Sequence, residues 1–206
     1  MKEWIKKIGQ NKFQFFFFVG ILALLVVALV VSTSIRETPK PPIDPPGEDP
    51  TDVEAVEEIK LPFADLDYKI VRKFYDKNES QENQLKGLIK YGNTYRTSLG
   101  TSFSCKNDEP FDVLASLSGK VVEIKESPLY GKYVVIEHKD NLKTYYYALS
   151  EVTVSVGADV SQGSKIGVSG HSEIDKEAGN HVYFKIVKSG KHLNPEKTIG
   201  KKTTDI

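Results

Sequence analysis

The fold is decided by four short runs: GKVVEIK (119–125), KYVVIEH (132–138), KTYYYAL (143–149) and HVYFKIV (181–187). Each is rich in β-branched or aromatic residues and is bounded by Gly, Asn, Asp or Ser, which is typical of a strand that ends in a turn. The segment 165–168 predicts a fifth strand, and Lys139-Asp140-Asn141 predicts a hairpin. Short strands at regular spacing favour a mainly β domain, an antiparallel sandwich or barrel.

Working outward from these strands, the chain has one helical pattern. Leu85, Leu88, Ile89 and Tyr91 recur at near-helical spacing and predict a helix over 80–91. The 141 residues of 61–201 are enough for one domain that buries roughly two-thirds of the surface of its unfolded chain.

The segment 34–60 differs in composition from this domain. It contains RETPKPPIDPPGEDPTDVEAVEEIK, which combines six prolines with many acidic residues and has no periodic apolar face. We expect an extended extracytoplasmic stalk, because polyproline II geometry advances about 3.1 Å per residue.

An apolar run, FQFFFFVGILALLVVALVV (13–31), precedes the stalk. Roughly 19 residues at 1.5 Å each span about 28 Å, close to the hydrocarbon thickness of a bilayer. The run predicts a transmembrane signal anchor over 13–33. A cleaved signal peptide with a site near 31–34 is the alternative, although its apolar region is usually about 7–15 residues long. The basic segment 1–12, with Lys2, Lys6, Lys7 and Lys12, predicts a cytoplasmic N-terminus and an extracytoplasmic C-terminal domain.

Charge and cysteine content restrict the function classes. The formal net charge is zero and no basic stripe follows the anchor, which argues against nucleic acid as a partner. Cys105 is the single cysteine, so an intrachain disulfide is excluded. We expect Cys105 to be a small apolar or surface residue.

The order of the strand runs resembles the LytM domain of the M23 zinc peptidases over 89–195. A VxxGxxVxxGxxIGxxG spacing between the third and last runs is similar to a β-turn-β element of that family, and an ordinary hairpin with turn glycines is the alternative. The spacing is formed by Val154, Gly157, Val160, Gly163, Ile166, Gly167 and Gly170.

The resemblance implies a site that has lost its chemistry. The family holds Zn²⁺ with HxxxD and the last His of HxH, leaving an open position for water. Here Ser98, Ser102 and Tyr183 stand at the three ligand positions, His181 keeps one catalytic His, and Ala148 replaces the other. The resemblance therefore implies a pseudoenzyme without metal or other cofactor, since hydroxyls are poor ligands for zinc.

Two alternatives for this site stay open. A shifted register would place Arg96 at the position of Ser98. A metal site could also be rebuilt from His181 with His138 or His171. Asp175 follows His171 by four residues, outside the family motif, and we expect that pair on a surface loop. His138 and His192 are expected in turns or at the surface.

The segments KFYDKNES (73–80) and KEAGNHVYFKI (176–186) resemble a sporulation branch of the family. That branch implies a non-catalytic receptor in the forespore membrane, if the host sporulates, acting in engulfment and in assembly of a channel between forespore and mother cell. The implied partner is an extracytoplasmic membrane protein similar to stage III sporulation protein AH. The alternatives are a regulator of a cell-wall amidase, which would meet peptidoglycan or its hydrolases, and an active zinc endopeptidase.

Overall fold

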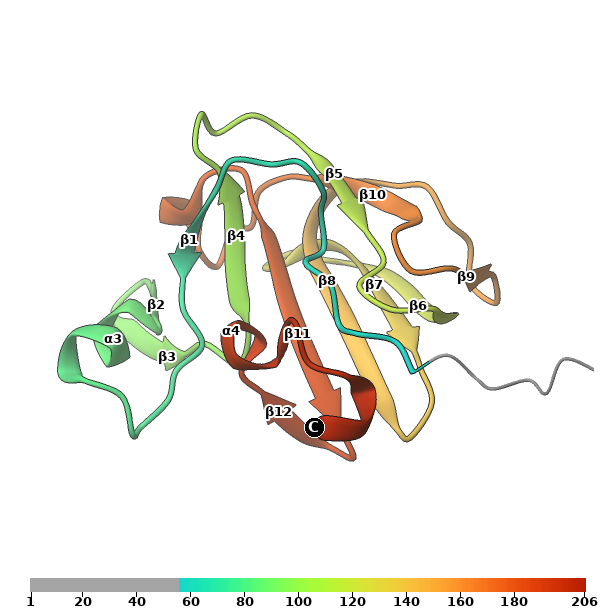
Figure 1. Cartoon of the computed structure of the whole chain (residues 1–206). Helices are drawn as coiled ribbons and strands as arrows, with labels where there is room; N and C mark the ends of the chain where they lie inside the picture. The colour runs from blue at the N-terminus through green and yellow to red at the C-terminus, as the bar shows by residue number, and fades with distance from the viewer. Residues whose placement is uncertain (1–55) are drawn as a thin grey trace, which may run out of the picture. The chain divides into compact units, whose positions relative to one another are not determined.

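The structure is a computed structural model that describes residues 56–206, and all paired strands in this part run antiparallel (Figure 1). The predicted cytoplasmic segment 1–12, the anchor 13–33 and most of the stalk 34–60 lie outside the described residues. From residue 56 onward, no helix is long and apolar enough to cross a bilayer.

The described residues form twelve strands and four short helices. In chain order these are β1 (Tyr68–Arg72), α3 (Gln81–Lys86), β2 (Leu88–Tyr91), β3 (Thr94–Thr97), β4 (Thr101–Cys105), β5 (Asp112–Leu114), β6 (Gly119–Ser127), β7 (Gly131–Glu137), β8 (Leu142–Val152), β9 (Asp159–Val160), β10 (Lys165–Ser169), η1 (Lys176–Ala178), β11 (Val182–Lys188), β12 (Lys191–Leu193), α4 (Pro195–Thr198) and η2 (Thr203–Asp205).

The main sheet has the strand order β1-β4-β11-β8-β7-β6-β9. The long strand β8 pairs with β7 and β11, and its last residues also pair with β10, which carries β5 on its other side. Val113 of β5 and Ile166 of β10 belong to the same core as Phe103 of β4 and Tyr146 of β8. Strands β5 and β10 therefore form a second layer over the face of the main sheet that lines this core, which we call the inner face. The predicted mainly antiparallel β fold is confirmed.

The chain before β1 crosses this inner face as a strap of residues 56–66 (Figure 1). Ile59 is 1% exposed and Phe63 is 6% exposed, and both belong to the core. The Ile59 N–H donates to the Lys201 carbonyl at 2.9 Å, and the backbones of Glu58 and Lys202 form an antiparallel β-bridge. Residues 57–60, which we expected in the stalk, thus pack with the domain, because Ile59 supplies an apolar side chain that fills the core.

The predicted strands are confirmed with boundaries shifted by at most a few residues. The hairpin between β7 and β8 is also found, with Asp140 and Asn141 at φ 56° and 53°. In the VxxG spacing, Gly157 and Gly163 have φ values of 88° and 84°, which glycine adopts readily, and lie in the turns before β9 and β10. Cys105, a free thiol in β4, is half-buried against the core.

The predicted helix over 80–91 is wrong in its second half. Ser80 caps α3 by accepting the Asn83 N–H, but the helix ends at Lys86 and residues 88–91 form β2. Gly87 ends the helix and lies against Tyr75, where a Cβ would come within 2.9 Å of the Tyr75 Cα. Leu88 and Ile89 fit either period, and their pairing with β3 makes them a strand.

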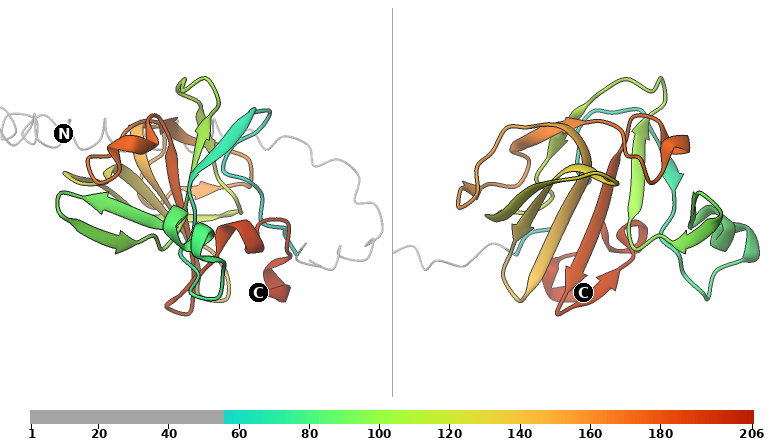
Figure 2. Two further views of the ribbon diagram at one scale, coloured as in Figure 1. Left: turned by 90° about the vertical axis from the view of Figure 1, so that its left-hand side faces the viewer. Right: turned by 180° about the vertical axis from the view of Figure 1, so that it is seen from behind.

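Strands β2 and β3 form a separate two-stranded sheet, which together with α3 projects from the side of the main sheet (Figures 1 and 2). We call residues 81–97 the projection. It exposes three large apolar side chains: Leu85 is 61% exposed, Tyr91 39% and Tyr95 65%, and Leu99 at its base is 41% exposed. The projection lies outside the strand pattern that sequence alone predicts.

Candidate functional site

Three positions assigned to zinc by resemblance come together at the start of β4 and β11. Ser102 lies opposite Tyr183 in the register of these two strands. The Tyr183 hydroxyl accepts the Leu99 N–H at 3.0 Å and lies 3.4 Å from the Ser98 Oγ. The Ser98 hydroxyl also donates to the Gly100 carbonyl at 2.8 Å. We call Ser98, Ser102 and Tyr183 the hydroxyl cluster.

The hydroxyl cluster is buried and uncharged. Ser98 and Ser102 are at most 1% exposed, and Tyr183 is 7% exposed. Burial raises the pKa of Tyr183 to about 12, so its phenol stays protonated at neutral pH. Zinc prefers imidazole, thiolate or carboxylate ligands, and these three side chains supply none of them. The donor set therefore does not fit a zinc ion.

The fourth predicted position, Ala148, sits beside the cluster on β8. It is fully buried, has φ 62°, and donates its N–H to the Tyr130 carbonyl at 2.8 Å. Its own carbonyl lies next to Gly170, where a Cβ would come within 3.1 Å of the oxygen. Gly170 forms a bridge with His181, so the backbone brings Ala148 and His181 into one region.

His181 is 1% exposed and both ring nitrogens face polar groups. Nδ1 lies 2.9 Å from the Gly179 carbonyl, which can only accept, so Nδ1 carries the proton. Nε2 then accepts from the Ser172 hydroxyl at 3.4 Å. Burial lowers the pKa of His181, so the ring is neutral at neutral pH. This arrangement uses the lone pair on Nε2 for a weak internal hydrogen bond.

The backbone around His181 is held by a second set of polar contacts. The Asn180 N–H donates to the Asp108 carboxylate at 2.8 Å, and the Asn180 side-chain oxygen accepts from Ser169 at 2.6 Å. Gly179 has φ 67°, and a Cβ there would lie 2.4 Å from the Asp108 carboxylate. The Gly-Asn-His sequence therefore fixes the start of β11.

We expected Asp175 on a surface loop, but this expectation is wrong, because Asp175 forms a buried ion pair. Its carboxylate accepts from Nε and Nη2 of Arg72, each at 2.8 Å, and the two side chains are only 5% and 12% exposed. Arg72 Nη1 also donates to the Leu88 carbonyl at 2.6 Å. Hydrogen bonding to Asp175 raises the pKa of Arg72. His171, as expected, is exposed.

The alternative metal site does not form between His181 and His138. His138 follows β7 at the end of the sheet opposite His181, about seven residues or roughly 23 Å away along a strand. Its ring nitrogens contact the Ser118 carbonyl and the Thr144 hydroxyl, both at 2.8 Å, so His138 is tied into the structure. Burial lowers its pKa. Among residues 56–206, no group of three or more His, Cys, Asp or Glu is placed to hold a metal.

Strands β7, β8 and β11 carry a group of neighbouring tyrosines, Tyr133, Tyr145, Tyr147 and Tyr183. Seen from behind, the outer face of these strands is not covered by a helix of the described part of the chain (Figure 2). The Tyr147 ring lies 4.8 Å from that of Tyr133 and 5.9 Å from that of Tyr183. The Lys185 ammonium lies 5.0 Å from the Tyr147 ring and 5.1 Å from that of Tyr145. These rings place an aromatic, mostly neutral surface beside the hydroxyl cluster.

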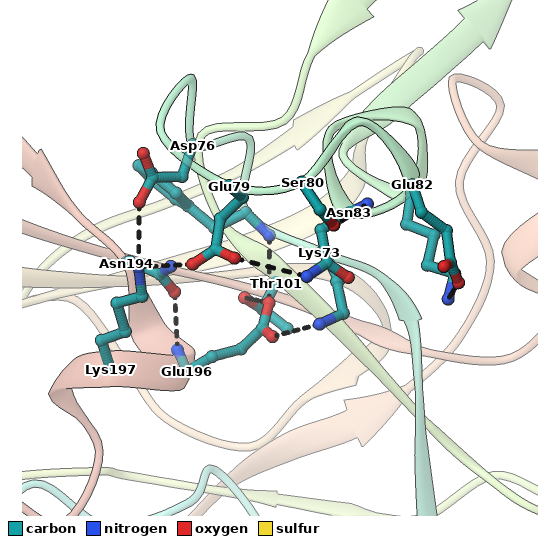
Figure 3. A network of polar contacts seen from close by, with 12 residues as sticks. Lys73, Asp76, Glu79, Ser80, Glu82, Asn83, Thr101, Asn194, Glu196 and Lys197 are labelled. Atoms are coloured by element: carbon teal, nitrogen blue, oxygen red, sulfur yellow. Dashed lines mark hydrogen bonds and ion pairs between the residues drawn. The ribbon is translucent and has the colours of Figure 1, made fainter.

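A polar network joins the segment 73–80 to α4 (Figure 3). Glu196 accepts the Phe74 N–H at 3.2 Å and pairs with Lys73 at 3.4 Å. Lys197 pairs with Asp76 at 3.0 Å and with Glu79 at 2.7 Å. The segment that leads into α3 is therefore fastened to α4 by hydrogen bonds and ion pairs.

Comparison with known proteins places this site in a family. The family model described as Peptidase family M23 matches residues 96–195. Stage II sporulation protein Q of Bacillus subtilis is 39% identical over 153 residues, which are 74% of this chain and 54% of that protein. The peptidoglycan DD-endopeptidase ShyA of Vibrio cholerae is 35% identical over 98 residues, 48% of this chain and 22% of that one.

A solved structure gives a fuller match. A chain in the SpoIIQ-SpoIIIAH pore forming complex is 38% identical, with a TM-score of 0.71, and the alignment covers 73% of this chain and 96% of that one. This chain thus spans about half the length of the curated sporulation protein, but nearly all of the part that was solved.

Proposed function

The chain belongs to peptidase family M23, and we propose that its domain is a receptor for another protein and does not hydrolyse peptidoglycan. The observation that carries the proposal is the likeness to a chain solved within a SpoIIQ-SpoIIIAH complex. The hydroxyl cluster supports it, because activating water for hydrolysis needs a metal that these side chains do not suit.

The proposed setting follows from the same likeness. Residues 13–33 anchor the protein in the forespore membrane with its N-terminus cytoplasmic, and the stalk between residue 34 and the strap carries the domain toward the mother cell. The partner is an extracytoplasmic membrane protein similar to SpoIIIAH. The receptor acts in engulfment and in assembly of a channel between the two cells.

We place the partner surface on the projection and the neighbouring edge strand. Six of the eight exposed large apolar side chains of the described residues lie there: Tyr68, Ile70, Leu85, Tyr91, Tyr95 and Leu99. Within the described residues, β3 pairs only with β2, so its outer edge keeps free backbone donors and acceptors. An open edge beside aromatic side chains suits a partner that adds a strand.

The test is a binding measurement between the fragment 34–206 and the extracytoplasmic part of the host's SpoIIIAH-like protein. We expect a complex at tens of micromolar or below, and no binding would refute the receptor. Capture of a cell-wall amidase in its place would favour the regulator.

Zinc content tests the chemical half of the proposal. The fragment, purified without added metal, should carry no stoichiometric zinc and should not cut peptidoglycan. One zinc per chain that is lost in a His181→Ala variant, together with cleavage, would identify an active endopeptidase.

A further inference from the structure

We propose that the Tyr183 hydroxyl holds β11 against the segment between β3 and β4, as a metal ion bound by both would do, and that this contact orients the projection. The proposal rests on the receptor function only where it concerns the partner. Its starting point is the disagreement between the family's zinc ligands and the hydroxyl cluster found here.

The tie is visible in the contacts of one hydroxyl. A metal held at these three positions would join the segment before β4, β4 itself and β11 through a single atom. In this chain the Tyr183 oxygen joins β11 to the segment before β4, by accepting the Leu99 N–H at 3.0 Å and approaching the Ser98 Oγ to 3.4 Å. Because the phenol stays protonated, it has both a lone pair and a proton to offer.

Close packing keeps the tie short. Gly100 follows the two tied residues, and a Cβ at this position would lie 2.3 Å from the Phe184 carbonyl and 3.0 Å from the Tyr183 ring. Glycine therefore lets β4 begin directly against β11. Ser98 is fully buried, so its polar contacts are made inside the protein and not with solvent.

From Ser98 the tie continues into the projection through the backbone. The Ser98 N–H donates to the Gly87 carbonyl at 2.8 Å, and the Ser98 carbonyl accepts the Tyr75 N–H at 3.0 Å. Gly87 is the residue between α3 and β2, and Tyr75 lies in the segment that leads into α3. Tyr183 is thus connected, through one buried serine, to the residue that follows α3 and to the segment that precedes it.

Tyr183 is therefore a positioning residue that acts on the partner surface from beneath. Leu99, whose N–H it binds, has an exposed side chain at the base of the projection. Without the hydroxyl, the Leu99 N–H loses its acceptor and the start of β4 is free to move. The projection would then sample orientations that do not fit the partner.

The test compares Tyr183→Phe with Tyr145→Phe in the fragment 34–206. Tyr145 is the matched control, because its ring lies on the same sheet face and no hydrogen bond of its hydroxyl is found within the described residues. In Tyr183→Phe we expect the Leu99 amide to exchange at least about tenfold faster, while core amides such as that of Phe184 keep their rates. Affinity for the SpoIIIAH-like partner should fall at least fivefold, and the control should change neither quantity.

Each failure is distinguishable. Unchanged exchange at Leu99 would overturn the tie, and equally faster exchange at all amides would show that Tyr183 serves only general stability. Faster exchange at Leu99 with unchanged partner affinity would overturn the link to the projection. If the unmodified fragment binds no partner, the receptor function fails, and the exchange data still decide the tie.

Discussion

The hydroxyl cluster and the projection differ in burial and in the kind of side chain that they present. The cluster is buried and neutral, and its Tyr183 hydroxyl contacts the Ser98 hydroxyl and the Leu99 N–H. The projection is exposed and carries aromatic side chains beside an open strand edge. The contrast teaches that a buried polar site and a set of exposed apolar side chains occupy separate parts of one domain.

Breaking the buried ion pair between Arg72 and Asp175 should have the largest effect. Arg72 binds Asp175 near His181 and also the Leu88 carbonyl at the start of β2. Arg72→Ala leaves a buried carboxylate unpaired, so we expect a loss of about 3–5 kcal/mol in the free energy of unfolding, measured by urea titration.

The control for Arg72→Ala is Lys106→Ala, which removes an ion pair with Asp67 whose side chains are 60% and 76% exposed. Exposed pairs contribute at most about 1 kcal/mol, so this variant should stay close to the unmodified protein. Similar losses in the two variants would show that burial of the Arg72 pair has no energetic weight.

Replacing the aromatic side chains of the projection should abolish recognition but not folding. For Tyr91→Asp with Tyr95→Asp we expect at least about a 30-fold loss of partner affinity, since a central tyrosine in an interface is commonly worth about 2 kcal/mol. Val156→Asp is the control, because Val156 is 59% exposed on a loop after β8. Full affinity in the double variant would move the partner surface away from the projection.

A His181→Ala variant tests the buried site and leaves the projection unaltered. The ring makes two internal hydrogen bonds and is nearly fully buried, so we expect a loss of about 1–2 kcal/mol in stability. Partner affinity should be unchanged. A loss of affinity without a loss of stability would mean that His181 takes part in recognition.

The same histidine makes stability depend on pH. Its pKa is lowered by burial in the folded state, so the unfolded chain binds more protons as the pH falls. Its contribution is complete above the unfolded pKa of about 6.5 and declines as the pH drops toward the folded value. The decline in stability between pH 7 and 5 should therefore be shallower in His181→Ala, although His138 keeps part of it.

The smallest effect is expected at Lys197, in the network at the base of the projection. The pKa of Asp76 is lowered, first by the Asn78 N–H and then by Lys197, and that of Glu79 is lowered mainly by Lys197. The stabilisation is present above the unfolded carboxyl pKa values and is lost as the pH falls through the folded ones. Lys197→Met should lower the melting temperature slightly at pH 7 and not at pH 2. An equal difference at both pH values would contradict this account.

The strands that were predicted from sequence are those whose pattern reflects burial. β7 and β11 are rich in β-branched and aromatic residues, because one or both faces of each lie in the core. β4, with the sequence TSFSC, was missed, although four of its five residues are buried. Small hydroxyl side chains fit a tightly packed strand but resemble a loop in any pattern of hydrophobicity.

The site could be predicted only in part, for a similar reason. The resemblance named Ser98, Ser102, Ala148, His181 and Tyr183, and the fold gathers them into one region. Neither periodicity nor spacing indicates that the Tyr183 hydroxyl accepts the Leu99 N–H, or that Arg72 pairs with a residue 103 positions away. Such contacts depend on where the strands cross, which local sequence does not encode.

The strap has a consequence for tension. The Ile59 backbone is hydrogen-bonded to Lys201 and Gly200, and the Glu57 carboxylate accepts two hydrogen bonds from Ser118. Figure 1 shows the strap beginning at the side of the main sheet away from the projection. A pull on the chain before the strap therefore acts first on the hydrogen bonds to Gly200 and Lys201, and the buried Ile59 side chain resists movement of the strap. A partner bound at the projection would pull on the domain from the other side, so tension between anchor and partner would be carried across the paired strands of the main sheet.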